Sequence, residues 1–175
     1  MSFTAYARFE GESGVIKGFT GEEEKSSDGK SIKDMSRVQS YCLDITIPTH
    51  QQTGEAQGPG KVSPLEITID CDCSIPELYR SMTLNKRLKE VKVYFFRSGA
   101  GERASGKPNE LFHNWYTVSI QDCRIVRMEQ TKPMVLDPER NLPDLMKVAF
   151  SFYKIKWEDH DDKKETEWEW KKKAG

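Results

Sequence analysis

Cysteines are the side chains of this sequence whose spacing first suggests chemistry. Cys71 and Cys73 stand one residue apart, as in the cysteine pairs that begin many zinc sites. A structural zinc site needs about four ligands, however, and usually takes a second close pair. The other cysteines, Cys42 and Cys123, stand alone. The period of the surrounding residues instead places Cys71 and Cys73 on the apolar side of a strand, as small core residues. We therefore expect free thiols, with no metal site and no disulfide.

Other catalytic patterns are missing as well. The three histidines stand far apart, and no serine occupies a G-x-S-x-G sequence. The acidic run 159–162 lacks the spacing and the glycine of a calcium loop. The glycine-rich stretch 99–107 lacks the order of a phosphate loop, since Pro108 follows its lysine. We expect a protein that is not an enzyme and that needs no cofactor.

Length and charge limit the remaining classes. The 175 residues are enough for one domain with a real core. Lys and Arg number 27 against 28 Asp and Glu, a net charge of -1, so no basic field draws the chain to nucleic acid. No apolar run is long enough to predict stable insertion in a membrane. Without the pattern of a signal peptide, we expect synthesis in the cytoplasm, and any export would need a route that reads no cleavable signal.

Alternation of apolar and polar residues at period two runs through the sequence and predicts an antiparallel β protein. It is clearest from Leu65 to Cys73, where the odd positions are Leu, Ile, Ile, Cys and Cys and the even ones Glu, Thr, Asp and Asp. A run that is apolar on both faces predicts a central strand at 91–96, and the alternating pattern predicts further strands at 3–9, 41–47, 115–128, 146–157 and 166–170. The last of these is expected at the edge of a sheet.

Two of the expected strands change their apolar parity part of the way along. In 115–128 the change falls near Gln121 and Asp122, and in 146–157 it follows Phe152. A β-bulge or a sharp bend accounts for such a change, and long bent strands are typical of barrels and orthogonal sandwiches. The predicted fold is mainly β, a β-barrel of two antiparallel sheets in orthogonal packing with one short flanking α-helix.

One helix is expected to begin at Ser74, which would supply the N-cap hydroxyl, with Glu77 three residues later. Its apolar residues recur at i, i+3, i+4 and i+7, which predicts one stripe packed on a sheet. The flanking-helix residues are Ser74, Glu77, Leu78, Tyr79 and Met82. Asn85 suits the left-handed end of this helix.

Long polar loops connect these elements. They fall at about 20–33, 50–61, 98–114 and 130–144, and a polar tail covers 159–175. None of them has the character of a linker between domains, so the expectation is a single domain over 1–175. Long loops on a compact scaffold are where binding residues concentrate.

The order of these elements resembles a known family, the haemolysin-coregulated proteins (Hcp) of bacterial type VI secretion. Residues 9–13 are similar to its G-E-S opening, and 65–79 resemble its strand followed by the S-P-x-L start of a helix. Residues 89–99 are similar to the strand and R-x-G turn, 115–127 take the place of the long strand, and 148–157 resemble the closing F-x-x-I-x-W strand. The loops at 98–114 and 130–144 are longer than is usual for the family.

The resemblance implies a homo-hexameric ring, with rings that stack into a tube. It also implies partners: a contractile sheath that expels the tube, a spike protein, and effectors carried in the lumen. We expect the contacts between rings in the loop 49–61, because long polar loops that end in Gly-Pro-Gly can fold out against a neighbour. The ring-stacking residues of this hypothesis are Thr53, Gly54, Glu55, Gln57, Gly58, Pro59, Gly60 and Lys61.

Three alternatives remain open from the sequence. The first is the tail-tube protein of a phage-like or extracellular contractile injection particle, which has the same architecture. The second is a monomeric β-barrel that binds a small ligand in its interior. The third, a hydrolase or metal-dependent enzyme, is disfavoured by the missing nucleophile, base and ligand set.

Overall fold

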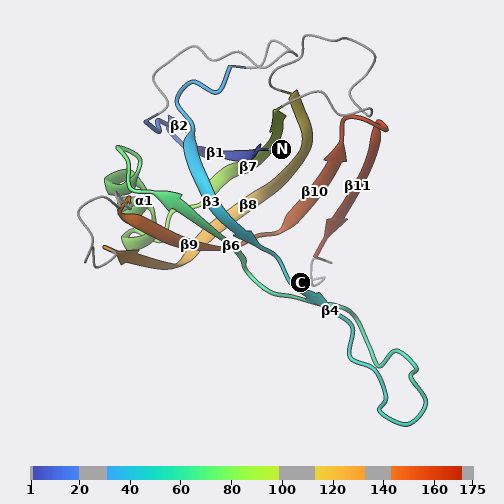
Figure 1. Cartoon of the computed structure of the whole chain (residues 1–175). Coiled ribbons are helices and arrows are strands. Elements are labelled where there is room, and N and C mark those ends of the chain that lie inside the picture. The colour runs from blue at the N-terminus through green and yellow to red at the C-terminus, as the bar shows by residue number, and fades with distance from the viewer. Residues whose placement is uncertain (1, 20–30, 99–112, 133–142, 171–175) are drawn as a thin grey trace.

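The computed structural model describes residues 2–19, 31–98, 113–132 and 143–170 (Figure 1). Most of the loops expected at 20–33, 98–114 and 130–144, and residues 171–175 of the tail, lie outside them. The elements in chain order are β1 Ser2–Gly11, β2 Gly14–Ile16, β3 Ser36–Cys42, β4 Ile45–Thr46, β5 Lys61–Val62, β6 Leu65–Asp70, α1 Ile75–Thr83, β7 Leu88–Ser98, β8 His113–Thr131, β9 Leu145–Ser151, β10 Lys154–Asp159 and β11 Lys164–Glu169.

The strands form a closed barrel. Neighbours follow the order β8-β7-β1-β3-β6-β9, and β9 pairs again with β8 to complete the circuit. The strands β10 and β11 extend the same sheet outward from β8, while β4 and β5 make a separate two-stranded sheet. The predicted mainly β fold, with a barrel and one short helix, is confirmed. The two expected layers of the barrel are parts of one continuous nine-stranded sheet.

Strand β8 closes the barrel because it changes partner along its length. Its first half pairs with β10 as far as Gln121, and its second half pairs with β9 from Arg124 onward. Between the two, Asp122 has a φ of 49°, a conformation that bends the strand. The expected change of parity is confirmed there, since burial passes from Val118 and Ile120 to Cys123 and Ile125. The register shift of this pairing lies farther on, between Ile125 and Arg127.

A second bend separates β9 from β10 at Phe152 and Tyr153, as the change of parity predicts. Phe152 is buried, and the Tyr153 backbone N–H donates to the Gln121 carbonyl at 3.2 Å. Trp170 N–H in turn donates to the Tyr153 carbonyl at 3.0 Å. The chain can therefore pass from the barrel wall to the β10–β11 extension without leaving its buried backbone groups unpaired.

The barrel interior is filled by apolar side chains from every wall strand. Phe9 of β1 and Phe150 of β9 are fully buried and stack with ring centroids 6.0 Å apart. Leu65, Ile67 and Ile69 of β6 are also fully buried, which confirms the alternation of that strand. Burying one such side chain contributes roughly 1.5–3 kcal/mol, so the interior stabilises the fold as a packed core.

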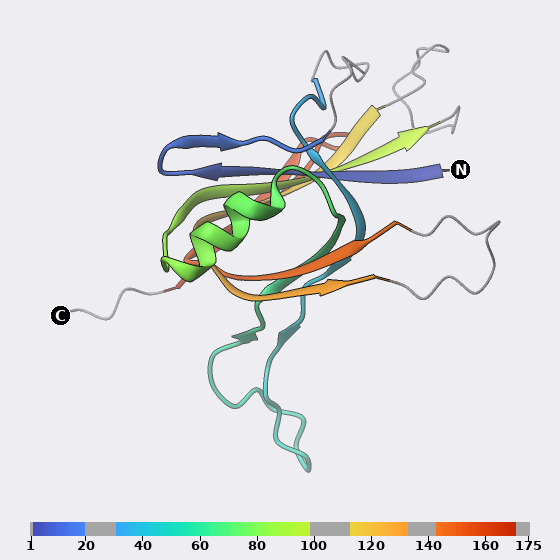
Figure 2. The same ribbon diagram turned by 90° about the vertical axis from the view of Figure 1, so that its left-hand side faces the viewer.

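Helix α1 lies against the outside of the barrel (Figure 2). It buries Ile75 and Leu78 and half-buries Tyr79 and Met82, so the predicted stripe is confirmed. Just beyond its end, Asn85 has a φ of 51°, as expected.

The predicted N-cap bond of Ser74 is wrong. The Ser74 hydroxyl makes no cap bond and instead donates to Asp72 Oδ1 at 2.5 Å, while the backbone N–H of Ser74 donates to the same oxygen at 2.9 Å. The side chain that arranges the helix start is therefore Asp72, which lies two residues earlier. Glu77 is exposed and lies 4.0 Å from Arg80, so it does not reach back to the N-cap.

Two strand predictions need correction at their ends. The strand expected at 41–47 breaks, because β3 ends at Cys42 and Asp44 bonds instead to Ser63, N–H to Oγ at 3.1 Å and C=O to N–H at 2.9 Å. The strand expected to reach Cys73 ends at Asp70. Cys71 is only half-buried and Cys73 is exposed, with its thiol 3.3 Å from the Lys17 carbonyl. The expectation that both thiols are core residues is therefore wrong for Cys73.

Candidate assembly surfaces

The largest projection of the molecule is the segment 43–64 between β3 and β6, which we call the arm. It leaves the barrel as two adjacent strands, β4 and β5, and ends in a loop well away from the barrel body (Figures 1 and 2). Nearly all its residues from Asp44 to Lys61 are exposed. A segment of this length standing clear of its own barrel has surface available for another molecule.

Backbone hydrogen bonds hold the arm in a defined shape. Thr49 and Ala56 form an isolated antiparallel bridge. Toward the tip, His50 N–H donates to the Glu55 carbonyl at 2.8 Å, and Gly54 N–H donates to the His50 carbonyl at 2.9 Å. Gly54 has a φ of 71°, a left-handed conformation that glycine adopts without strain. The arm is a folded hairpin that presents a fixed surface.

The structure places every residue of the ring-stacking hypothesis on this arm. All are exposed except Gly60, which is half-buried beside Ile47. The flanking-helix residues lie elsewhere, because the arm enters β6 at one end and α1 follows β6 at the other. The structure therefore brings the predicted loop residues together and keeps the helix residues apart from them.

The exposure of two residues of the arm was not predicted from the sequence. Ile45 is 47% exposed and Ile47 57% exposed at its base, although their alternation with Tyr41 and Leu43 predicts a buried strand face. Pro48, directly after them, could have indicated that the strand does not continue into the barrel, because proline limits the pairing of a strand. Between Ile45 and Gly60 the arm carries a single carboxylate, Glu55, and no lysine or arginine. Exposed isoleucines on an almost uncharged arm suit contact with protein.

A second candidate surface is the free edge of β11. This strand pairs with β10 on one side and, within the described residues, with no strand on the other. Its glutamates pair with lysines of β10, Glu167 with Lys154 at 2.7 Å and Glu165 with Lys156 at 2.8 Å. The hydrogen bond that Lys156 donates to Glu165, ahead of the one that it donates to Glu158, raises the pKa of the Lys156 ammonium. A free edge presents backbone donors and acceptors to an incoming strand.

Two histidine contacts resemble parts of a catalytic site, yet both are structural. His113 Nε2 lies 2.8 Å from Asp161 Oδ1, and Arg97 donates to the other oxygen of this carboxylate at 3.0 Å. His160 Nε2 lies 2.8 Å from the hydroxyl of Thr117. Thr117 is only 2% exposed, however, so its hydroxyl is out of reach of a substrate. These hydrogen bonds attach the turn after β10 to the end of β7 and the start of β8.

Nor do the described residues gather a metal site: none of their His, Cys, Asp and Glu side chains form a group of three that could hold an ion. Within the same ranges, no helix has the length and apolar character needed to cross a membrane. What the described surface does offer is an exposed arm and an unpaired strand edge. The fold and these surfaces define a structural β-barrel protein with an exposed arm and a free strand edge.

Comparison with known proteins identifies the family. The family model described as "Type VI secretion system effector, Hcp" matches residues 10–158. The chain therefore belongs to the Hcp family of type VI secretion, a family of structural tube proteins and not of enzymes. The resemblance of its sequence motifs is confirmed.

Individual relatives agree with this assignment. The "Major exported protein" of Pseudomonas aeruginosa PAO1 is 26% identical over 126 residues, which cover 71% of this chain and 69% of that protein. A crystal structure of an Hcp protein has a TM-score of 0.81 at 24% identity, over 98% of this chain and 100% of that chain. The secreted protein Hcp3 of Pseudomonas aeruginosa has a TM-score of 0.70 at 21% identity, over 97% and 99%. At these identities the solved structures show the shared fold.

Proposed function

We propose that this chain is the repeating subunit of a type VI secretion tube, in which copies close into hexameric rings and the rings stack head to tail. The family assignment supports the tube, and the free edge of β11 supports the ring. A strand edge that recurs once per subunit can meet a different surface of the next copy, and such heterologous contacts close into a ring.

The observation that carries the stacking part of the proposal is the arm. It stands clear of its own barrel, is held in one shape by its hydrogen bonds, and exposes Ile45 and Ile47 at its base. Covering these half-exposed side chains on an adjacent ring would contribute on the order of 1 kcal/mol each. Because a hexameric ring presents the arm of every copy at once, modest contacts add up along the whole face.

The tube proposal also fixes where the protein acts. We propose that it is made in the bacterial cytoplasm, leaves the cell without a cleavable signal, and is expelled by a contractile sheath behind a spike protein, with effectors in its lumen. The printed name of the Pseudomonas aeruginosa relative, an exported protein, supports the export. The family match supports type VI secretion over the tail tube of a phage-like particle.

Electron microscopy of purified protein tests the proposal in two stages. We expect negative-stain images of the unaltered chain to show rings with a central hole, and tubes at higher concentration. Removal of residues 52–57 should leave rings but abolish tubes. The same loss is expected from the double substitution Ile45→Ser and Ile47→Ser, which keeps the arm at full length.

The matched control is Val126→Ser on β8, which removes a similarly exposed side chain (48%) away from the arm. It should leave tube formation unchanged. If the shortened arm still stacks as well as the control, the arm is not the stacking surface. If the unaltered chain sediments as a monomer at every concentration, the ring itself is refuted.

A further inference from the structure

The barrel wall has an opening between β1 and β3. The two strands pair only at Ala5–Ala7 with Ser36–Val38, and β3 then shifts register against β6 and turns away from β1. Residues 2–4 of β1 keep their pairing with β7, and residues 40–42 of β3 keep theirs with β6. Between these two stretches lies a pocket of about 310 Å³, a volume at the lower end of those that bind ligands.

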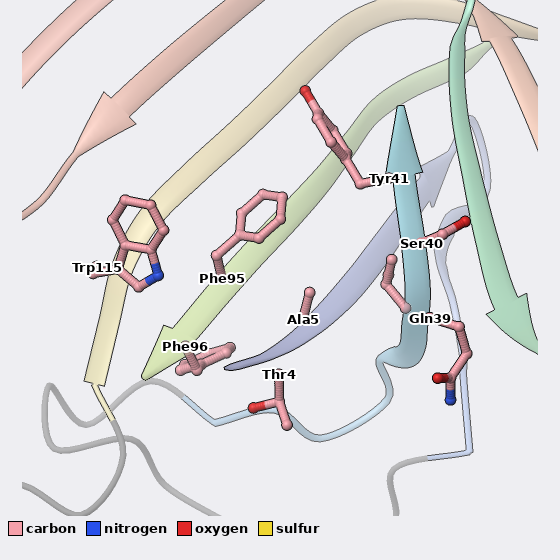
Figure 3. A pocket seen from close by; sticks show the side chains of 9 residues that line it. Thr4, Ala5, Gln39, Ser40, Tyr41, Phe95, Phe96 and Trp115 are labelled. Atoms are coloured by element: carbon pink, nitrogen blue, oxygen red, sulfur yellow. The ribbon is translucent and has the colours of Figure 1, made fainter. Parts of the chain in front are cut away.

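Aromatic rings line this opening (Figure 3). Tyr41 meets Phe95 edge to face with centroids 5.3 Å apart, and Trp115 lies beyond Phe95 on the neighbouring strand. Tyr41, Phe95 and Trp115 are each half-buried, so the opening exposes part of each ring. Burial, the largest effect, raises the pKa of the Tyr41 hydroxyl, which therefore stays an uncharged phenol.

Two polar side chains at the rim are engaged with β6. Gln39 donates to Asp70 at 2.8 Å, and the Ser40 hydroxyl donates to Thr68 at the same distance. Both partners belong to β6, on the side away from the opening. Among the described residues, no lysine, arginine, aspartate or glutamate lines the pocket. These walls therefore favour an uncharged, apolar group.

Trp115 contributes its ring to the opening, while its indole nitrogen is buried and makes no hydrogen bond within the described part of the chain. The nitrogen lies on the side of the ring that faces Phe95 and Phe96 (Figure 3). The Arg97 guanidinium lies 4.0 Å from the centroid of the same ring. Because a group in the opening cannot reach the buried nitrogen, an occupant would contact the exposed part of the indole ring.

We propose that this opening binds an extended segment of another protein, which adds to a free strand edge and seats one aromatic side chain against Phe95 and Tyr41. An aromatic side chain matches the edge-to-face geometry of the walls.

The two strand edges favour a polypeptide over a small molecule. Residues 2–4 of β1 and 40–42 of β3 each have a strand on one side and, among the described residues, none on the other. An extended peptide can bond to such an edge as an added strand while its alternate side chains fill pockets. This inference goes beyond the tube proposal and does not depend on it.

The test uses the full chain labelled with 5-fluorotryptophan, whose Trp115 resonance is assigned by the variant Trp115→Phe. The probe is the capped pentapeptide Ac-Val-Thr-Phe-Thr-Val-NH2, with Ac-Val-Thr-Ser-Thr-Val-NH2 as its matched control. We expect a saturable shift of the Trp115 fluorine signal with the first peptide, and affinity lower by about tenfold or more with the second. The Trp170 signal, outside the pocket, should stay fixed with both.

Variants then separate the pocket from the rest of the surface. Ala5→Leu fills the floor and should weaken binding by about tenfold, whereas Ser40→Ala, which removes a hydroxyl engaged with β6, should leave binding unchanged. The circular dichroism of both variants should stay that of the unaltered chain. The proposal is overturned by equal shifts with both peptides, by no shift at millimolar peptide, or by capped phenylalanine amide binding as tightly as the pentapeptide. It is also overturned if protein concentration alone moves the Trp115 signal, which would make a second copy the occupant. Ring formation is measured separately, by microscopy. The tube proposal and the peptide-binding proposal can therefore fail independently.

Discussion

At the scale of single residues, burial separates side chains that look equivalent in the sequence. Cys73 and Cys123 each continue an apolar alternation, yet Cys73 is exposed and Cys123 fully buried. The difference arises because β6 ends at Asp70, and the chain then turns into α1 under the control of the Asp72 carboxylate. Period alone cannot reveal where a strand ends, since that depends on a local bond that competes with the ladder.

This contrast predicts the reactivity of the thiols. Burial raises the pKa of the Cys123 thiol to about 12, whereas Cys42 and Cys73 are exposed. We expect a pulse of iodoacetamide at neutral pH to modify Cys42 and Cys73 in the native protein and Cys123 only after denaturation, because the thiolate is the reactive form. Mass spectrometry of tryptic peptides measures each site. Modification of Cys123 as fast as Cys42 in native protein would contradict the closed core.

A second residue-scale prediction concerns Gly18, which follows β2. A Cβ added there would lie 2.5 Å from the Met35 carbonyl oxygen and 2.7 Å from the Ser36 backbone nitrogen. Since both are backbone atoms, the strand itself would have to move, and we expect Gly18→Ala to destabilise the protein by roughly 1–3 kcal/mol. Urea denaturation measures the loss.

The control for this substitution is Gly11→Ala, made at the other end of the same hairpin. An added Cβ at Gly11 meets its nearest neighbour, the Gly14 carbonyl oxygen, at an ordinary 3.7 Å. If the two variants lose the same free energy of unfolding, the close approach of Gly18 to the backbone before β3 does not explain the cost of a side chain there.

At the scale of elements, the sequence predicts strands well and their partners poorly. Alternation identifies β1 and β6, a run apolar on both faces identifies β7, and a change of parity identifies both bends, because these signals lie within a few neighbouring residues. The arm is different: Ile45 and Ile47 continue the pattern of Tyr41, and only the pairing of Asp44 with Ser63 shows that the chain has left the barrel. The opening between β1 and β3 was missed for the same reason, since it depends on where two distant strands part.

The turn between β10 and β11 supports a prediction of pH dependence. Backbone N–H groups of Asp162 and Asp161 donate to Asp159 Oδ1 at 3.1 and 2.9 Å. Led by the bond from Asp162, they hold the pKa of the Asp159 carboxyl below its ordinary value of 3.8. A lowered native pKa gives stability that is complete above the unfolded pKa and is lost as the pH falls through the native one.

The variant Asp159→Asn keeps an oxygen acceptor but cannot titrate. We expect its melting temperature to fall less steeply than that of the unaltered chain between about pH 5 and pH 2. Asp162→Asn, which removes a carboxylate from the same turn, serves as the control and should retain the steep fall. Parallel curves for Asp159→Asn and the unaltered chain would show that the turn does not contribute to acid sensitivity.

At the scale of the whole molecule, the barrel and the arm should differ in local stability. Wall strands such as β7 have a partner on each side, whereas the hydrogen bonds of the arm tip lie among exposed residues. We expect amide hydrogens of 49–57 to exchange long before those of β7, which should exchange only with global unfolding. Hydrogen exchange read by mass spectrometry tests this prediction. Exchange in the arm as slow as in β7 would contradict it.

The two edges of β8 carry a mechanical consequence. One edge is bonded to β7, and the other is bonded first to β10 and then to β9. A hairpin pulled apart at its open end breaks one rung at a time, but a strand held along both edges in a circuit cannot be peeled in that way. A force along β8 must break many of its hydrogen bonds together, so the wall should resist such a force better than a force that peels a strand from a free edge.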